Sequence, residues 1–323
     1  MATLKGATLT LLMGPTAVKP APPEVLAALE GAQVTMAAGQ RSGFQLTFAF
    51  SKTSPIARRL LPQGFFDPMI RVIMIATLRG SPTVLMDGPI RRVDVTGTGQ
   101  PGENRLTVSG EDVGGYMDAV DLTGLPFPAM PPFARVALMM TKYIPFGVIP
   151  VTIPAPLQAP ANPLERIPQQ QGTDWEYANQ LAREAGYVFY VSPGPKPGMN
   201  TAYWGPAIRV GAVQPALTLD MDHAANLNAM TFTIDGAAAV LPFAFVKIGP
   251  APVPVPVPDI GLLKPPLAAR PVVPTRTRLL DTDRMSMPEA MSKVLAGSGA
   301  AEPLSASGTL DVARYGRPLR ARQ

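Results

Sequence analysis

Three polar residues near the middle of the chain have side chains that could do chemistry. His223 is the only histidine among 323 residues, and it lies beside Asp220 and Asp222 in the run LDMDHAAN. An imidazole near two carboxylates suits acid/base work or metal binding. The chain has no second histidine and no cysteine to complete such a site. A polar turn between strands is therefore the favoured interpretation.

Two further motifs resemble catalytic or phosphate-binding elements. Glu111 and Asp112 are a pair of carboxylates, but they are adjacent in sequence and so are not placed on two sides of a substrate, as paired-carboxylate hydrolysis requires. Residues 97–102 read GTGQPG, without the lysine and helix that follow a phosphate loop. We interpret the carboxylates as solvated or capping groups and the glycine-rich run as a hairpin turn.

Aromatic and basic side chains give two open alternatives. Trp175, Tyr203 and Trp204 could stack on a sugar, but aromatic residues at helical spacing or at strand ends are usually core or interface anchors. The arginines could line a lumen or pair with carboxylates of a neighbour; they are Arg91, Arg92 and Arg320. We expect no catalytic, cofactor-binding or metal-binding residue.

The composition favours a β-rich chain with a sizeable core. Hydrophobic residues make up 46% of the sequence, which excludes disorder throughout, and 39 prolines and 29 glycines punctuate short strand-like runs. The formal net charge is +5, but Lys and Arg are scattered, so a specific nucleic-acid site is not expected. The N-terminal residues lack an export signal, and no apolar run is long enough to anchor the chain in a membrane.

We expect a first β-barrel over residues 1–122. In RSGFQLTFAF, Phe44, Leu46, Phe48 and Phe50 alternate with smaller or polar residues, which predicts a strand buried on one face. Residues 68–78 and 83–95 predict a hairpin around residues 79–82, with a bend at residues 87–89. Further strands are predicted at residues 7–12, 33–36 and 104–109, and a helical turn follows Pro22. These strands suit a small closed or half-closed barrel.

A small α/β region is expected over residues 123–206. Residues 133–143 predict a helix, and residues 145–168 predict extended surface chain. Residues 174–185 predict an amphipathic helix, capped by Thr173 or Asp174 at its start and by Gly186 at its end, with Glu176 adding a favourable charge. A strand is predicted at residues 187–191.

A second β-barrel is expected over residues 207–323. Strands are predicted at residues 208–210, 216–219, 227–234 and 240–248, and a short helix at residues 287–296. The run APVPVPVP lies within a proline-rich insertion, residues 250–274, for which we predict extended polyproline structure.

Several of these segments, taken in order, resemble the late control protein D-like baseplate hub proteins of contractile phage tails and injection systems. The matching segments are SGFQLTF (Ser42 to Phe48), VLMDGPI (Val84 to Ile90), SGED (Ser109 to Asp112), GTDWEYANQLAREAGYVFYV (Gly172 to Val191), AYWGP (Ala202 to Pro206) and TLDVARYGRPLRAR near the end. Their order and coverage make the match specific, although none is a catalytic signature.

The resemblance implies a mainly β (α+β) architecture, with two tube-protein-like β-barrels separated by the small α/β region. It implies a non-enzymatic structural protein without cofactors, a homotrimer that adapts the sixfold inner tube to the threefold spike. The implied partners are the inner tube protein, a separate spike protein and baseplate wedge proteins, with the tape-measure protein or payload as a further candidate in the lumen. Synthesis in the bacterial cytoplasm and assembly into a baseplate follow.

Two other function classes stay open at this stage. A carbohydrate-binding or carbohydrate-cleaving β-barrel protein is suggested by the tyrosine and tryptophan clusters and the scattered carboxylates. A nucleic-acid-binding barrel is the third alternative, and its affinity for DNA would depend steeply on salt.

Overall fold

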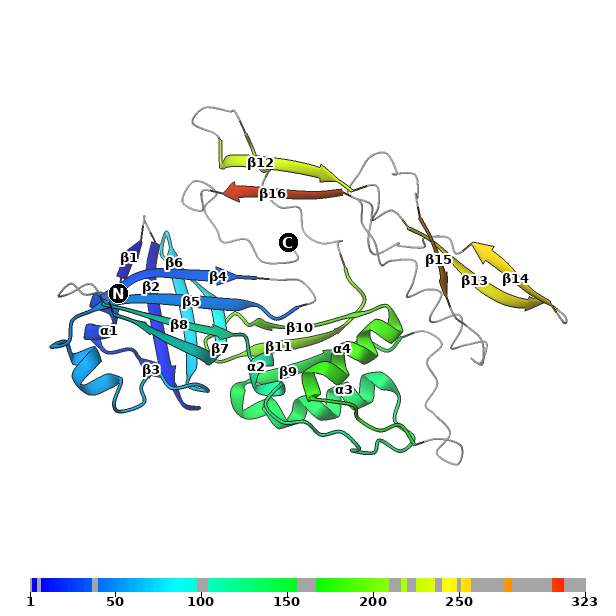
Figure 1. Cartoon of the computed structure of the whole chain (residues 1–323), viewed down its shortest axis with the longest axis horizontal. Coiled ribbons are helices and arrows are strands. Elements are labelled where there is room, and N and C mark those ends of the chain that lie inside the picture. The colour runs from blue at the N-terminus through cyan, green and yellow to red at the C-terminus, as the bar shows by residue number, and fades with distance from the viewer. Residues whose placement is uncertain are drawn as a thin grey trace.

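A computed structural model of the chain describes residues 2–4, 7–36, 40–97, 104–155, 167–208, 216–219, 225–235, 240–248, 251–256, 276–280 and 304–310. Strands dominate, as Figure 1 shows, which confirms the mainly β class. The described elements fall into an N-terminal sheet, a small α/β region and short C-terminal sheets.

The N-terminal sheet has eight strands in the order β1-β2-β6-β7-β8-β5-β4, with β3 also paired to β2. The predicted alternation of β5 (Gly43–Phe50) is confirmed, because Phe44, Leu46, Phe48 and Phe50 are all buried. The other strands are β1 (Ala2–Leu4), β2 (Ala7–Gly14), β3 (Lys19–Pro20), β4 (Leu29–Thr35), β6 (Arg71–Leu78), β7 (Ser81–Thr96) and β8 (Asn104–Glu111).

The long strand β7 joins the two halves of this sheet. Its first half pairs with β6 and its second half with β8, and the register shifts near Leu85 and Arg91, on either side of the bend predicted at residues 87–89. A Cβ added at Gly88 would lie 2.1 Å from the Glu111 carbonyl oxygen, so this crossing requires a glycine. The predicted hairpin is confirmed, with positive φ at Arg79 (48°) and Gly80 (83°).

The sheet folds over one hydrophobic core. Within the described residues its pairing ends at β4 on one side and at β1 and β3 on the other. Helix α1 (Pro23–Ala28) and the π-helical turn η1 (Ile56–Leu60) add Val25, Ile56 and Leu60 to the core inside the sheet. Phe66 packs against Phe48, with ring centroids 5.5 Å apart.

The α/β region has three strands and the predicted capped helix. Helix α4 (Asp174–Ala185) begins with a capping box between Thr173 and Glu176 and ends at Gly186, whose φ is 67°. Both predicted caps are therefore confirmed. The other elements are α3 (Pro132–Met140), the 3-10 helix η2 (Thr141–Phe146), β9 (Val148–Thr152), β10 (Val188–Pro193) and β11 (Asn200–Gly205). The sheet order is β10-β11-β9.

Two features of this region differ from the sequence expectation. Residues 148–152, expected as extended surface chain, form strand β9 parallel to β11. A second hydrophobic core, separate from the one inside the N-terminal sheet, lies in the α/β region. Short helix α2 (Gly114–Met117), placed within the first domain of residues 1–122, contributes Tyr116 and Met117 to this second core, and the preceding Val113 joins them. Sequence patterns did not reveal these contacts because their partners lie far along the chain.

The described part of residues 207–323 contains five strands in two sheets. Strands β12 (Leu227–Ile234) and β16 (Leu304–Leu310) form a ribbon, and β13 (Val240–Ile248) pairs with β14 (Ala251–Pro256) and β15 (Arg276–Leu280). The strands predicted at residues 227–234 and 240–248 are confirmed. Among the described residues these sheets are separate, so the second barrel stays a prediction.

Two predictions in this part are wrong. Residues 216–219 are described without a strand. Residues 251–256, expected as polyproline structure, pair with β13 as an edge strand. Prolines at every second position leave the alternate N–H groups free to bond to β13, because alternate residues of a strand face the same edge. The helix predicted at residues 287–296 lies outside the described residues.

Candidate functional site

Two networks of hydrogen-bonded polar side chains lie where the N-terminal sheet meets the α/β region. We name them the buried joint, formed by Arg71, Asp87, Asn200 and the Phe146 carbonyl, and the surface joint, formed by Arg41, Arg91, Glu111, Asp112 and Asp118.

The buried joint is built around a two-pronged ion pair. Arg71 Nε and Nη2 donate to the two oxygens of Asp87, at 2.7 Å each, and Arg71 Nη2 also donates to the Phe146 carbonyl at 2.8 Å. Both side chains are almost fully buried, with relative exposures of 4% and 0%. A planar guanidinium suits this geometry because it presents parallel N–H donors to a carboxylate.

Asn200 extends the buried joint into the α/β sheet. Its Nδ2 donates to Asp87 Oδ2 at 2.8 Å and to the Phe146 carbonyl at 3.0 Å. Arg71 and Asp87 come from β6 and β7, Phe146 from η2 and Asn200 from β11. The Phe146 ring stacks on Tyr116 with centroids 4.1 Å apart. One network thus fastens two layers of the fold together.

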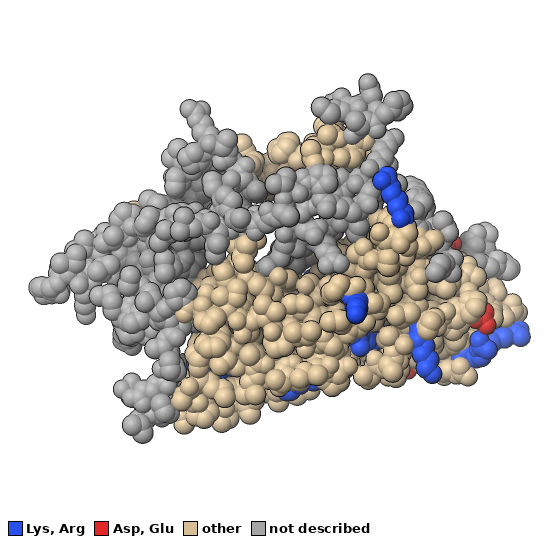
Figure 2. Space-filling model, turned by 180° about the vertical axis from the view of Figure 1, so that it is seen from behind, with Lys and Arg blue, Asp and Glu red and all other residues tan. Residues whose placement is uncertain are grey.

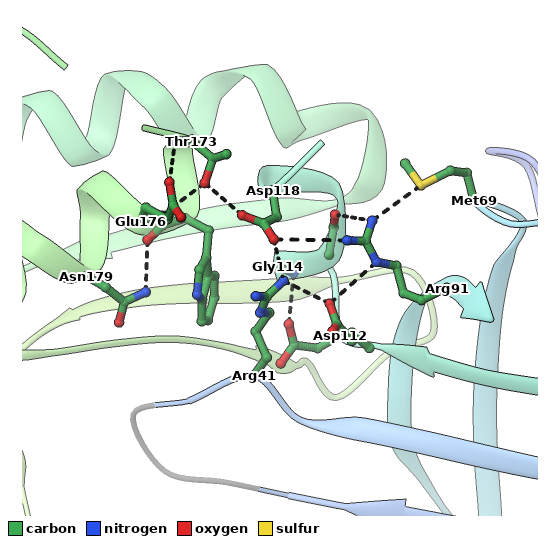
Figure 3. A network of polar contacts seen from close by, with 12 residues as sticks. Arg41, Met69, Arg91, Asp112, Gly114, Asp118, Thr173, Glu176 and Asn179 are labelled. Atoms are coloured by element: carbon green, nitrogen blue, oxygen red, sulfur yellow. Dashed lines mark hydrogen bonds and ion pairs between the residues drawn. The ribbon is translucent and has the colours of Figure 1, made fainter. Parts of the chain in front are cut away.

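The surface joint connects the residues just before β5 to α2 and α4 (Figure 3). Arg41 Nη1 donates to Glu111 Oε2 at 3.0 Å and to Asp118 Oδ2 at 2.9 Å, and its guanidinium lies 5.3 Å from the Trp175 ring centre. Asp118 Oδ1 accepts from the Thr173 hydroxyl at 2.8 Å, which links the joint to the start of α4. Arg91 contacts the same two carboxylates at 3.7 and 4.0 Å.

Asp112 is the buried member of the surface joint. Its oxygens accept from the backbone N–H of Ser42 at 2.6 Å and of Gly114 at 2.8 Å. Burial raises the pKa of Asp112 to about 7, and the neighbouring Glu111 adds to this, while the two N–H donors and Arg41 act in the opposite direction. The desolvation of the Asp112 carboxylate therefore outweighs the stabilisation of its charged form by the two N–H donors and Arg41.

These arrangements hold structure together. Each carboxylate oxygen of Asp87 and Asp112 already accepts from a guanidinium, an amide or a backbone N–H. A shallow depression of about 480 Å³ lies beside the surface joint, lined by Gln40, Arg41, Trp175, Glu176, Asn179 and Arg183. Among the described residues, no cluster of three or more His, Asp or Glu side chains suits a metal ion.

The structure places several of the candidate residues and leaves others outside its description. Glu111 and Asp112 belong to the surface joint; Asp112 is buried rather than solvated, and it accepts from the backbone N–H of Ser42 and Gly114 without being the N-cap of α2. Arg91 joins them, whereas Arg92 pairs with Asp94 on the surface at 2.8 Å. His223, Asp220, Asp222, Arg320 and residues 98–102 lie outside the described residues.

Two of the three aromatic candidates, Trp175 and Trp204, belong to the second core. Trp204 is fully buried and its Nε1 donates to the Ala178 carbonyl at 3.2 Å, and Trp175 is 8% exposed. Tyr203, also 8% exposed, packs against the Tyr190 ring and its hydroxyl donates to the Pro206 carbonyl. The interpretation as core anchors is confirmed for the two tryptophans.

The buried joint escaped the sequence analysis. Arg71 was covered only as part of the strand predicted at residues 68–78, and Asp87 only as part of the bend at residues 87–89. A charged residue within an apolar strand is itself a signal, because a buried charge requires a partner. Asp87 lies 16 residues from Arg71, across the predicted hairpin, whereas Asn200 lies 113 residues from Asp87 and no local pattern links the two.

Charged side chains elsewhere are dispersed. On the face in Figure 2 the visible Lys and Arg side chains lie scattered over the described surface and do not gather into a patch. In the described part of the chain, no helix is long and apolar enough to cross a bilayer.

Comparison with solved structures identifies the fold. The chain matches the tail protein from Neisseria meningitidis MC58 over 94% of its own length and 80% of that protein, with 13% sequence identity and a TM-score of 0.58. The 43 kDa tail protein of prophage MuSo2 from Shewanella oneidensis matches over 97% and 86%, with 11% identity and a TM-score of 0.58. The chain shares its fold with these two tail proteins.

A third match is a chain of a two-protein complex from Francisella. It belongs to the lidded Francisella PdpA-VgrG complex, and the match spans 87% of the present chain and 41% of the Francisella chain, at 7% identity and a TM-score of 0.50. No protein-family model and no curated protein matches the sequence. The tail-protein fold thus rests on shape, with little shared sequence.

Proposed function

We propose that this chain is the central hub of a contractile tail or injection-system baseplate. It forms a homotrimer that seats the sixfold inner tube on one face and holds a separate threefold spike on the other. It acts through assembly rather than catalysis.

One observation carries the proposal: two phage tail proteins share the fold over 94% and 97% of this chain. The ordered resemblance of its segments to baseplate hub proteins points the same way. Three copies with two barrel-like units each present six positions around one axis, so a single ring meets both symmetries.

The joints suit a part that transmits load. The buried joint ties β6 and β7 of the sheet to η2 and β11 of the α/β region, and the surface joint ties the start of β5 to α2 and α4. Packed interiors resist compression and pass on displacement. A hub built this way moves as one body when the tail contracts.

The proposal assigns the partners and the place of assembly. The hub binds itself, the first ring of the inner tube, the spike and the baseplate wedges, with the tape-measure protein or payload in the lumen. It is made in the bacterial cytoplasm and becomes part of the baseplate.

Light scattering and electron microscopy of the purified chain test the proposal, alone and with its tube and spike proteins. We expect the mass of three chains and a threefold ring that nucleates tube growth, with tube protein alone as the control. A chain that stays monomeric beside both partners, at every concentration tried, refutes the hub.

A further inference from the structure

The free edges of the described sheets differ in how they are protected. An unpaired strand edge invites pairing with another chain, and proteins block it with prolines, charges, short strands or covering elements. In β9, Ile153 N donates to Trp204 O and Asn200 N to Gly147 O, so odd-numbered residues face β11 and Pro150 faces the free edge. Pro150 therefore removes a donor from that edge.

Other edges carry a comparable device. Strand β1 has only three residues, and β10 contacts β7 and ends at Pro193. The remaining edge strands contain prolines or charged residues, namely Lys19 and Pro20 in β3, Glu30 in β4, Pro252, Pro254 and Pro256 in β14, and Arg276 and Arg278 in β15.

The ribbon β12–β16 lacks these devices. Its strands have eight and seven residues, LNAMTFTI and LSASGTL, without a proline or a charged residue. Within the described residues, Leu227 N at the start of β12 donates to Thr218 O, and neither outer edge of the ribbon pairs with a further strand. A two-stranded ribbon is at best marginally stable alone in water.

The two faces of the ribbon also differ in chemistry. The register pairs Phe232 with Ala306 and Ile234 with Leu304, while Thr231 faces Ser307 and Thr233 faces Ser305. One face is therefore apolar and the other carries hydroxyl groups. Phe232 and Ile234 are 66% and 67% exposed, although large apolar side chains are usually buried.

We infer that the ribbon β12–β16 is the contact through which one copy of this chain binds the next. A ring of identical subunits needs two complementary surfaces on every copy, one on each side. Among the described residues the ribbon offers two edges that no further strand pairs with, β12 and β16, whereas a single different partner needs only one. The inference rests on the proposed homotrimer and names the surface that closes it.

The test places charges on the apolar face. Phe232→Lys with Ile234→Lys is compared with wild type and with Val95→Lys, a matched control because Val95 is an exposed valine (57%) of β7. We expect a wild-type trimer by light scattering, a monomeric double variant with an unchanged circular dichroism spectrum, and a trimeric Val95→Lys variant. All three positions are exposed, so folding should tolerate the lysines.

The outcomes separate the two proposals. A double variant that trimerises as well as wild type overturns the ribbon contact and leaves the hub intact. A wild-type dimer that the double variant loses supports the ribbon contact and refutes the threefold hub. A wild-type chain that stays monomeric at all concentrations, both alone and beside its tube and spike proteins, overturns both.

A spin label gives a second readout that does not depend on a disruptive variant. The chain has no cysteine, so Phe232→Cys carries the label at one site, and Val95→Cys serves as the control. We expect the label at position 232 to lose mobility as the concentration rises and the control label to keep it. A label whose mobility does not change with concentration overturns the contact.

Discussion

Removing the carboxylate of the buried joint tests whether the two layers of the fold are coupled. In Asp87→Ala the Arg71 guanidinium loses two 2.7 Å hydrogen bonds in a site where its side chain is 4% exposed. A charge left unpaired inside a protein costs about 3–5 kcal/mol. We expect the free energy of unfolding to fall by about that amount.

The double variant Arg71→Met with Asp87→Leu is the matched control. Apolar side chains of similar size in place of a buried ion pair often leave stability unchanged or raise it. The double variant should therefore be more stable than Asp87→Ala. This ordering distinguishes an unpaired charge from a simple loss of packing.

Urea unfolding with two probes measures both effects. Both tryptophans, Trp175 and Trp204, lie in the second core, so their fluorescence reports on the α/β region, while circular dichroism reports on all the strands. In wild type the two transitions should coincide. In Asp87→Ala we expect the fluorescence transition to separate from the other. A loss below about 1 kcal/mol, well under the usual cost of unpairing a buried charge, with coincident transitions, refutes the coupling.

Three further predictions concern local features. Thr173→Ala removes the capping hydroxyl of α4 and should cost about 1 kcal/mol by thermal or urea unfolding, whereas Gln180→Ala, on the exposed face, should change stability little. Leu46→Ala empties a fully buried position and should cost about 2–5 kcal/mol; a smaller loss would mean that the core of the N-terminal sheet collapses around the gap. Because burial raises the folded pKa of Asp112 to about 7, the unfolded chain releases this proton first as pH rises from about 4 to 7, and wild type should lose stability relative to Asp112→Asn across that window. A relative gain for wild type would mean that the two N–H donors outweigh burial.

Local sequence patterns predicted the elements whose signals lie within a few residues. The caps of α4, the alternation of β5 and the hairpin at Arg79 and Gly80 were all readable, because caps, strand period and turns depend on neighbours in the chain. The same reasoning failed for β14, where regular prolines suggested polyproline structure. A strand and a polyproline segment are both extended, and only the partner β13 decides between them.

The sequence alone determined the mainly β class and the boundaries of helix α4. Only the tertiary structure decided that Arg71, Asp87 and Asn200 meet, that β9 pairs with β11, and which strand edges stay open. These features depend on contacts between residues far apart in the chain. A charged residue in an apolar segment indicates that a partner is needed, but the sequence does not identify the residues that the fold places beside it.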